Sequence, residues 1–283
     1  MSDLNKIQPI HIQGAMDYHV HCDYSIDAEG TIDEFCEAAI KRNLAEICFT
    51  THYDANPNSD GNVEYIVVKG QKRPVSPDSL AYYVDDVRRA AEEFYARGLS
   101  VKLGVEIGWF KGCEEIVQRL KERFNFDYVL CGIHEIEDIC FCCSHSYEKC
   151  FRRYQPEQVA EKYFEDVILA AKSGLFDSIA HLVYYLRSGQ DYYGDKILRV
   201  HEPFLEDTFK ALIASDTGIE INTSGIRHGF KEYYPRMNVI NAAKKAGVEV
   251  NFLGSDAHKP EQIGYDFEAA LALVPDSIRG CED

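Results

Sequence analysis

Short apolar runs alternate with longer amphipathic stretches along almost the whole chain. The apolar runs are rich in Val, Ile, Leu, Phe and Cys, which is typical of β-strands buried on both faces. We predict strands at Ala15–Val20, Ala45–Thr50, Ser100–Glu106, Tyr128–Ile133, Ser178–His181, Gly218–Asn222 and Glu249–Gly254.

The stretches between these runs carry helix signals. Thr31-Ile32-Asp33-Glu34 has the spacing of a capping box and predicts a helix that reaches about Asn43. The stretch Pro77–Arg97 predicts a long helix that ends at Gly98. Further helices are predicted at Cys113–Phe124, Pro156–Ser173, Glu202–Ser215, Arg236–Ala246 and Pro260–Leu273.

The order of these elements predicts an α/β fold. Seven uninterrupted β-then-α units favour a (β/α)7 parallel barrel over an open sheet with a separate domain. We find no internal repeat, low-complexity tract or linker, so we expect residues 1–283 to form a single domain. The long polar segment Asn56–Asp78 could be a lid or simply a loop.

Histidine and acidic residues recur where the predicted strands end. Six of the 10 histidines belong to this set. Since the carboxyl ends of the strands of a parallel barrel meet on one face, we expect one pocket that collects ligands from many strands. Imidazole and carboxylate suit zinc, manganese or iron. The candidate metal ligands are His19, His21, Asp27, His52, Glu106, His134, His181, Asp256 and His258.

The spacing within this set adds to the argument. His19 and His21 are two residues apart on an extended segment, which places both imidazoles on one face. Asp256 and His258 repeat that spacing on the last strand. Any one histidine is more often a hydrogen-bonded core or surface residue, but the recurrence at strand ends favours a metal centre.

The charge balance limits the partners. The chain has 30 Lys and Arg against 47 Asp and Glu, a formal net charge of −17, so we expect no nucleic-acid partner. No apolar run is long enough to span a membrane, and the N-terminus has no apolar stretch of a signal peptide. We therefore expect a cytoplasmic protein without a membrane partner, and the sequence leaves the oligomeric state open.

Ten cysteines are expected to be reduced in such a protein. Most lie in apolar runs and suit small buried side chains. The segment Cys140-Phe141-Cys142-Cys143, with His145 and Cys150 nearby, is denser. It could bind a separate zinc ion, but it lacks the paired CxxC spacing of structural zinc sites, which favours ordinary thiols.

The motifs at the strand ends resemble those of the polymerase and histidinol phosphatase (PHP) superfamily, and within it those of the monofunctional histidinol phosphatases. The resemblance covers nearly the whole chain and implies a distorted (β/α)7 barrel. The matching segments are Asp17–Ala28, Ile47–His52, Gly104–Trp109, Gly132–Ile136, Ala180–Leu182, Glu220–Arg227 and Leu253–His258.

The resemblance implies three divalent ions, which could be zinc, manganese or iron. It assigns the first to His19, His21, Glu106 and Asp256, the second to Glu106, His134 and His181, and the third to Asp27, His52 and His258. Many relatives have His at the place of Asp27, although Asp is also familiar among histidinol phosphatases. An Asp there could favour manganese or iron over zinc.

The resemblance also implies a substrate and a reaction. Three divalent ions would outweigh three carboxylates and one hydroxide, which leaves a positive charge suited to a phosphate dianion. Arg187 and Arg227 are the expected phosphate clamps, because guanidinium binds phosphate with two hydrogen bonds. Salt bridges to nearby carboxylates are the alternative. Asp256 or His258 could help to protonate the leaving alkoxide.

We therefore expect a metal-dependent phosphoesterase in which a metal-bridging hydroxide attacks a small phosphomonoester. The resemblance implies that this substrate is L-histidinol phosphate, as in histidine biosynthesis. Two features leave room for another sugar or nucleotide monophosphate, or a cyclic phosphodiester. Val183 stands where histidinol phosphatases often have Asp, and the Cys-rich stretch Glu137–Tyr154 looks individual. A barrel that binds metal without turnover is the remaining alternative.

Overall fold

A closed parallel barrel forms the centre of the computed structural model, which describes residues 14–60, 65–143 and 146–273. Neighbouring strands pair in the order β2-β1-β12-β11-β10-β7-β6, and β2 pairs again with β6 to close the ring. The seven strands are β1 (Met16–Val20), β2 (Glu46–Phe49), β6 (Ser100–Gly108), β7 (Tyr128–Gly132), β10 (Ser178–Ile179), β11 (Gly218–Asn222) and β12 (Val250–Gly254). The predicted seven-stranded barrel is confirmed.

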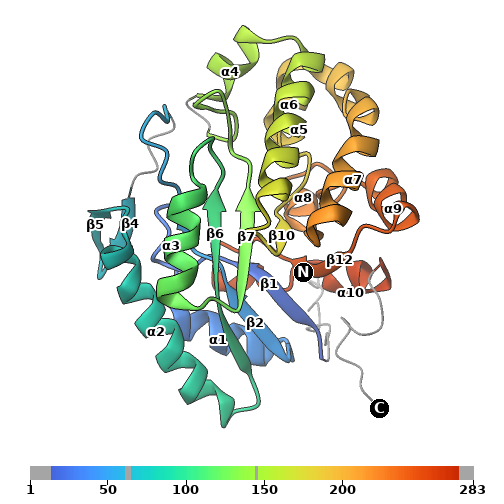
Figure 1. Cartoon of the computed structure of the whole chain (residues 1–283). Helices are drawn as coiled ribbons and strands as arrows, with labels where there is room; N and C mark the ends of the chain where they lie inside the picture. Colours follow the sequence, from blue (N-terminus) through green and yellow to red (C-terminus); the bar gives the residue numbers. More distant parts are fainter. Residues whose placement is uncertain (1–13, 61–64, 144–145, 274–283) are drawn as a thin grey trace, which may run out of the picture.

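Helices surround the barrel (Figure 1). The predicted capping box is present in α1, where the Thr31 hydroxyl accepts from the Glu34 amide and the Glu34 carboxylate accepts from the Thr31 amide at 2.8 Å. The predicted helices correspond to α1 (Ile32–Lys41), α2 (Pro77–Tyr95), α3 (Glu114–Phe124), α5 (Pro156–Ser173), α7 (Leu205–Ser215) and α9 (Met237–Ala246). The sequence did not predict α4 (Tyr147–Arg153), α6 (Leu186–Tyr193) or α8 (Ser224–Arg227).

The prediction of one helix over Pro260–Leu273 is wrong. The segment forms three short pieces: η3 (Pro260–Gln262), α10 (Phe267–Ala270) and η4 (Leu271–Leu273). Between the first two, Gly264 and Asp266 have φ angles of 59° and 57°, which no right-handed helix accommodates. The Gly264 amide instead donates to the buried Asp17 carboxylate at 2.9 Å, which ties this segment to β1. A second predicted helix, Glu202–Ser215, begins as the 3-10 turn η2 (Glu202–Phe204).

Aromatic side chains fill the barrel interior on the side away from the cavity. Tyr18 stacks on Phe252 with ring centroids 3.8 Å apart and packs edge-on against Tyr128. The register of the β1–β2 ladder shifts between Asp17 and Val20. Such an irregularity re-aims side chains, and here Tyr18 joins this interior cluster while the next residue, His19, contacts the candidate ligands.

The polar segment Asn56–Asp78 is not an unstructured loop throughout. It contains a hairpin of β4 (Tyr65–Val68) and β5 (Gln71–Pro74), and residues 61–64 lie outside the described part. Ile66 and Val68 are buried, and Val67 donates its amide to the Tyr24 carbonyl at 2.9 Å. The hairpin is therefore packed onto the body of the protein, and none of its described residues lines the cavity introduced below.

A second hairpin carries the Cys-rich segment. It pairs β8 (Glu135–Ile136) with β9 (Ile139–Cys140). Cys140 and Cys143 form a disulfide in this structure, so the expectation that all cysteines are reduced is wrong for this pair. The physical reason is the tight turn after β9, which brings the two Cα atoms within 5.9 Å. His145 lies outside the described residues.

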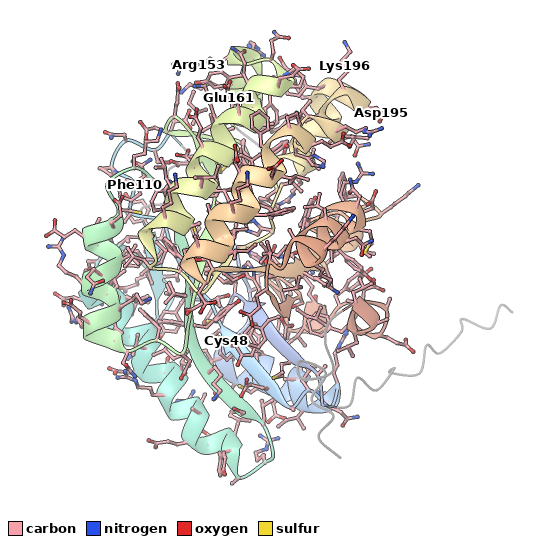
Figure 2. All side chains as sticks on the ribbon, turned by 45° about the vertical axis from the view of Figure 1, so that its right-hand side comes forward. Cys48, Phe110, Arg153, Glu161, Asp195 and Lys196 are labelled. Atoms are coloured by element: carbon pink, nitrogen blue, oxygen red, sulfur yellow. A yellow bond between two sulfur atoms is a disulfide. The ribbon has the colours of Figure 1, made fainter. Side chains whose placement is uncertain are left out.

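The outer surface of the helices is charged. Figure 2 shows Glu161 on α5 and Asp195 and Lys196 at the start of the 3-10 helix η1 (Gly194–Arg199), all exposed, whereas Cys48 of β2 is buried. Among the described residues no helix combines the length and apolar character needed to cross a membrane.

Candidate metal centre

The ends of six barrel strands bring all nine predicted ligands together at one end of the barrel. His52 begins the short strand β3 (His52–Tyr53), which continues the line of β2 and pairs with β6. A cavity of about 640 Å³ opens above them. Its lining includes Asp27, His52, His134, His181, Asp256 and His258. The other three predicted ligands, His19, His21 and Glu106, are fully buried beneath it.

Glu106 lies between two groups of imidazoles. Its Oε1 is 2.9 Å from His181 Nε2 and 3.2 Å from His134 Nε2. Its Oε2 is 3.0 Å from His52 Nδ1 and 3.2 Å from His19 Nε2. Each carboxylate oxygen thus faces its own set of ring nitrogens, which is the arrangement expected of a carboxylate that bridges two cations.

Ring nitrogens also converge on one another beside Asp256. The Nε2 atoms of His19 and His21 are 3.0 Å apart, and Asp256 Oδ1 is 3.7 Å from the former and 3.4 Å from the latter. Two neutral imidazole nitrogens at this distance need a shared proton or a cation between them. The donor set therefore fits a metal ion held by two histidines and a carboxylate.

A third group borders the first two. Asp27 Oδ2 is 3.2 Å from His258 Nε2 and 3.9 Å from His52 Nε2. Because His52 uses its Nδ1 toward Glu106, its ring stands between the Asp27 group and the buried carboxylate. The three groups are thus contiguous, and each contains both imidazole and carboxylate donors.

The electrostatics favour the ligand forms of the two buried carboxylates and of His21. Burial alone would raise the pKa of the Glu106 carboxyl, but the nearby His19, His52 and His134 lower it well below its usual value. The pKa of Asp256 is lowered in the same way by His19 and His21 against the effect of burial. Burial and the neighbouring His52 lower the pKa of His21. Anionic carboxylates and a neutral imidazole are the states that bind metal. The neighbouring carboxylates raise the pKa of His19, His52 and His134 against the effect of burial, so these imidazoles would lose a proton when they bind metal.

The sequence did not identify Glu220, which orients two of the candidate ligands. This β11 carboxylate lies 3.0 Å from His19 Nδ1 and accepts the His181 backbone amide at 2.7 Å and the Asn222 side-chain amide at 2.9 Å. A carboxylate on one ring nitrogen directs the other toward the metal position. The sequence did hold a signal for Glu220, because an acidic side chain within an otherwise apolar strand must have a buried partner.

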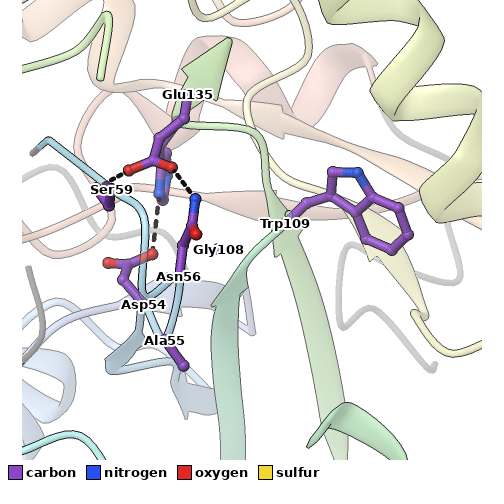
Figure 3. Close-up of a pocket in the computed structure, with 8 residues that line it drawn as sticks. Asp54, Ala55, Asn56, Ser59, Gly108, Trp109 and Glu135 are labelled. Carbon is purple, nitrogen blue, oxygen red and sulfur yellow. Dashed lines mark hydrogen bonds and ion pairs between the residues drawn. The ribbon is translucent and has the colours of Figure 1, made fainter. Parts of the chain in front are cut away.

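Asp54 lies beside His134 in a similar way, and the sequence analysis did not identify Asp54 either. Its Oδ1 is 3.4 Å from His134 Nδ1 (Figure 3). Gly108 makes room for it, because a Cβ at that position would lie 2.0 Å from Asp54 Oδ1. Nearby, Glu135 accepts hydrogen bonds from Asn56 at 2.7 Å and from Ser59, which ties the segment after β3 to the β8–β9 hairpin (Figure 3).

The two candidate phosphate clamps have different surroundings. Both line the cavity. Arg227 donates to the carbonyls of Ser255 and Asp256 at 2.8 and 2.7 Å, so two of its N–H groups are occupied by backbone. Arg187 donates to the Tyr184 hydroxyl and has no carboxylate within ion-pair distance in the described part of the chain. Arg187 is therefore the freer of the two to bind an anion.

Residues close to His181 complete the wall. The Tyr184 ring stacks on the His181 imidazole with centroids 4.1 Å apart. Val183 has a φ of 67°, is fully buried in the hydrophobic core and is not among the residues that line the cavity. The structure therefore gives no support to the idea that Val183 itself reshapes the pocket, whereas Cys140, Cys142 and Cys143 do line it.

A parallel barrel whose strand ends carry clustered imidazoles and carboxylates is the architecture of a metal-dependent barrel protein. The PHP domain model matches residues 17–224, which is more than half of the chain, and the chain belongs to this family.

Curated relatives match along nearly their whole length. A protein of Deinococcus radiodurans named probable histidinol-phosphatase is 28% identical, and the match covers 93% of this chain and 94% of that protein. The histidinol-phosphatase of Lactococcus lactis is 27% identical, with 92% of this chain and 90% of that protein covered.

Solved structures agree on the fold. The histidinol phosphate phosphatase of Lactococcus lactis, complexed with zinc, L-histidinol and phosphate, matches with a TM-score of 0.71 at 20% identity over 93% of each chain. A putative histidinol phosphatase of Listeria monocytogenes gives a TM-score of 0.74 at 18% identity over 90% of this chain and 99% of the other. At these identities the likeness shows a shared barrel.

Proposed function

We propose that the protein is a metal-dependent phosphoesterase that hydrolyses L-histidinol phosphate to L-histidinol and phosphate. The observation that carries the proposal is Glu106, whose two oxygens face separate groups of imidazoles at the floor of a cavity with Arg187 in its wall. Membership of the PHP family supports the reaction class. The substrate is supported by relatives named histidinol-phosphatases, which match over 90% or more of the chain.

The centre holds three divalent ions in this proposal. His19, His21, Glu106 and Asp256 bind the first, Glu106, His134 and His181 bind the second, and Asp27, His52 and His258 bind the third. The mixture of imidazole and carboxylate suits zinc, manganese or iron, and the related Lactococcus structure is a complex with zinc. When bound, the ions supply a nucleophilic water at neutral pH and neutralise charge on the phosphoryl oxygens.

The side chains around the centre hold and orient the substrate. Arg187 lies in the cavity wall with its guanidinium not neutralised by a carboxylate among the described residues, and it binds the phosphate oxygens with charge-assisted hydrogen bonds. Arg227 supports this indirectly, because it donates to the carbonyls of Ser255 and Asp256 and so holds the backbone around the candidate ligand Asp256. Tyr184 holds the His181 ring by stacking.

The departing alkoxide needs a proton or a cation. His258 lies in the cavity wall, and the attraction of Asp27 and Asp256 raises its pKa against the effect of burial. Because His258 and Asp256 would both hold metal in this proposal, they would stabilise the leaving oxygen through the ions that they hold rather than by giving up a proton. The cavity volume of about 640 Å³ lies in the range that encloses a small ligand.

Phosphate release from L-histidinol phosphate tests the proposal. Protein freed of metal with a chelator should be inactive, and it should recover when manganese or zinc is returned. Glu106→Gln should lower kcat by about 100-fold or more, because one bridging charge is lost from the metal site. Glu161→Gln, an exposed acid on α5, is the matched control and should act like wild type. Activity that survives both chelation and Glu106→Gln would overturn the proposal.

A further inference from the structure

Three cysteine side chains line the cavity at the end of β9 and directly after it. Cys140, Cys142 and Cys143 all line the cavity above the histidine and carboxylate centre. Their sulfur atoms lie within 4.8 Å of one another, and Sγ of Cys140 is 3.4 Å from Sγ of Cys142. None of the three is used in the reaction proposed above. They form a separate group of soft donor atoms, which we call the cysteine cluster.

The backbone holds this cluster in place. The Cys143 amide donates to Cys140 Sγ at 3.1 Å, and the Ser146 hydroxyl donates to the Cys140 carbonyl at 3.0 Å. The Phe141 amide donates to the His134 carbonyl at 3.1 Å. This hydrogen bond ties the cysteine turn after β9 to the backbone of a candidate metal ligand. Amide hydrogen bonds to sulfur stabilise metal-bound thiolates. The turn thus provides both the donors and part of their supporting contacts.

We propose that the cysteine cluster, in its reduced form, binds one thiophilic divalent ion such as zinc or cadmium, in addition to the ions of the histidine and carboxylate centre. Three thiolates satisfy most of the tetrahedral coordination that zinc prefers. The cluster lines the cavity, so the remaining position faces a space that admits water or an anion. Sulfur donors select such ions over manganese, which prefers oxygen ligands.

The disulfide between Cys140 and Cys143 and the bound ion exclude each other. A small-molecule thiol opens the site: two reductant thiols give up two electrons and two protons, they become a disulfide, and the Cys140–Cys143 bond becomes two thiols. Each of the three thiols then loses its proton to the solvent as its sulfur–metal bond forms. Oxidation therefore closes the site, and reduction makes it available.

Cadmium titration of the whole protein tests this proposal. Thiolate-bound cadmium has a charge-transfer absorption in the ultraviolet, whereas cadmium on imidazole and carboxylate has none, so ions taken up by the histidine centre give no signal. Protein reduced with a thiol and then freed of it should develop this absorption as cadmium is added, with a final amplitude that corresponds to one thiolate-bound ion per chain. Protein oxidised at Cys140–Cys143 should not develop it.

Two variants locate the signal. Cys142→Ser should weaken cadmium binding at this site by at least about 10- to 100-fold, because one of three sulfur donors is lost. Cys113→Ser, which removes a buried cysteine at the start of α3, is the matched control and should titrate like wild type. Circular dichroism should show that both variants are folded.

The proposal is overturned if the reduced, folded protein shows no thiolate absorption, or if Cys142→Ser and the wild type titrate alike. Either result would leave the proposed hydrolysis untouched, because hydrolysis is measured separately on the manganese-loaded wild-type protein.

Discussion

Arg187 and Arg227 show how the partners of a residue decide its role. Both are arginines at the wall of one cavity. Arg227 is held by two backbone carbonyls, whereas the Arg187 guanidinium contacts the hydroxyl and ring of Tyr184 and has no carboxylate partner among the described residues. A guanidinium without a carboxylate partner keeps its charge for a ligand, whereas one bound to backbone carbonyls stabilises the chain that it holds.

Arg187→Ala should therefore lower kcat/KM for the phosphate substrate about 10- to 100-fold, since charged hydrogen bonds of about 1.5–3 kcal/mol are lost, with little change in thermal stability. Arg227→Ala should in addition lower the free energy of unfolding by about 1–3 kcal/mol, because two buried carbonyls lose their donor. Steady-state kinetics and thermal melts separate the two. Equal losses of stability in both variants would contradict the assignment.

Glu220 acts through its neighbours rather than on the substrate. Its carboxylate touches the His19 ring and the His181 amide and also accepts from Asn222. Replacing it with Gln keeps the shape but removes the negative charge that favours the Nδ1–H form of His19. The imidazole would then be a weaker ligand through Nε2.

Glu220→Gln should weaken metal binding about 10- to 100-fold. Metal content after dialysis against a weak chelator measures this directly, without relying on activity. Excess metal should restore part of kcat in the variant, a response that a purely structural defect would not give. Metal content equal to that of wild type under the same dialysis would refute this role.

At the scale of elements, local sequence signals predicted where a helix begins, whereas contacts with distant residues decided whether a segment stays helical. Thr31 with Glu34 predicted the beginning of α1, because a capping box depends only on neighbours in sequence. The segment after Pro260 looked helical, but Asp17, far away in sequence, accepts the Gly264 amide and the segment turns. The convergence of the candidate ligands was predictable because strand ends share one face, whereas the places of Glu220 and Asp54 depend on contacts that the sequence does not encode locally.

The α1 cap gives a prediction at this scale. Thr31→Ala removes the hydroxyl that accepts the Glu34 amide and should lower the free energy of unfolding by about 1 kcal/mol. Thr31→Ser keeps the hydroxyl and should lose much less. Chemical denaturation of the metal-free protein measures both. If Ala and Ser behave alike, the cap does not stabilise the helix.

At the scale of the whole molecule, the barrel brings many buried histidines together, and not all of them belong to the metal centre. His201 is fully buried between η1 and η2, and neither of its ring nitrogens has a hydrogen-bond partner in the described residues. Burial lowers the pKa of His201 to about 4. Folding therefore requires this imidazole to be neutral.

The lowered pKa of His201 determines how the stability depends on pH. The stability that a neutral His201 provides is present above pH 6.5, the ordinary histidine value, and is lost as the pH falls toward 4. Between pH 7 and pH 4 this loss amounts to about 2–3 kcal/mol. His201→Asn cannot take up the proton, so its metal-free form should lose that much less stability over the same range. Parallel pH profiles of unfolding in the two proteins would contradict the prediction.

The central claim joins the metal centre to one substrate, and a comparison of substrates tests it most directly. Phosphate release by the manganese-loaded protein should be measured with L-histidinol phosphate beside sugar monophosphates, nucleoside monophosphates and cyclic phosphodiesters. We predict that histidinol phosphate leads the panel with kcat/KM of about 10⁵ M⁻¹s⁻¹, within the usual range of enzymes. A different ester that leads by a wide margin, with histidinol phosphate hardly hydrolysed, would contradict the account.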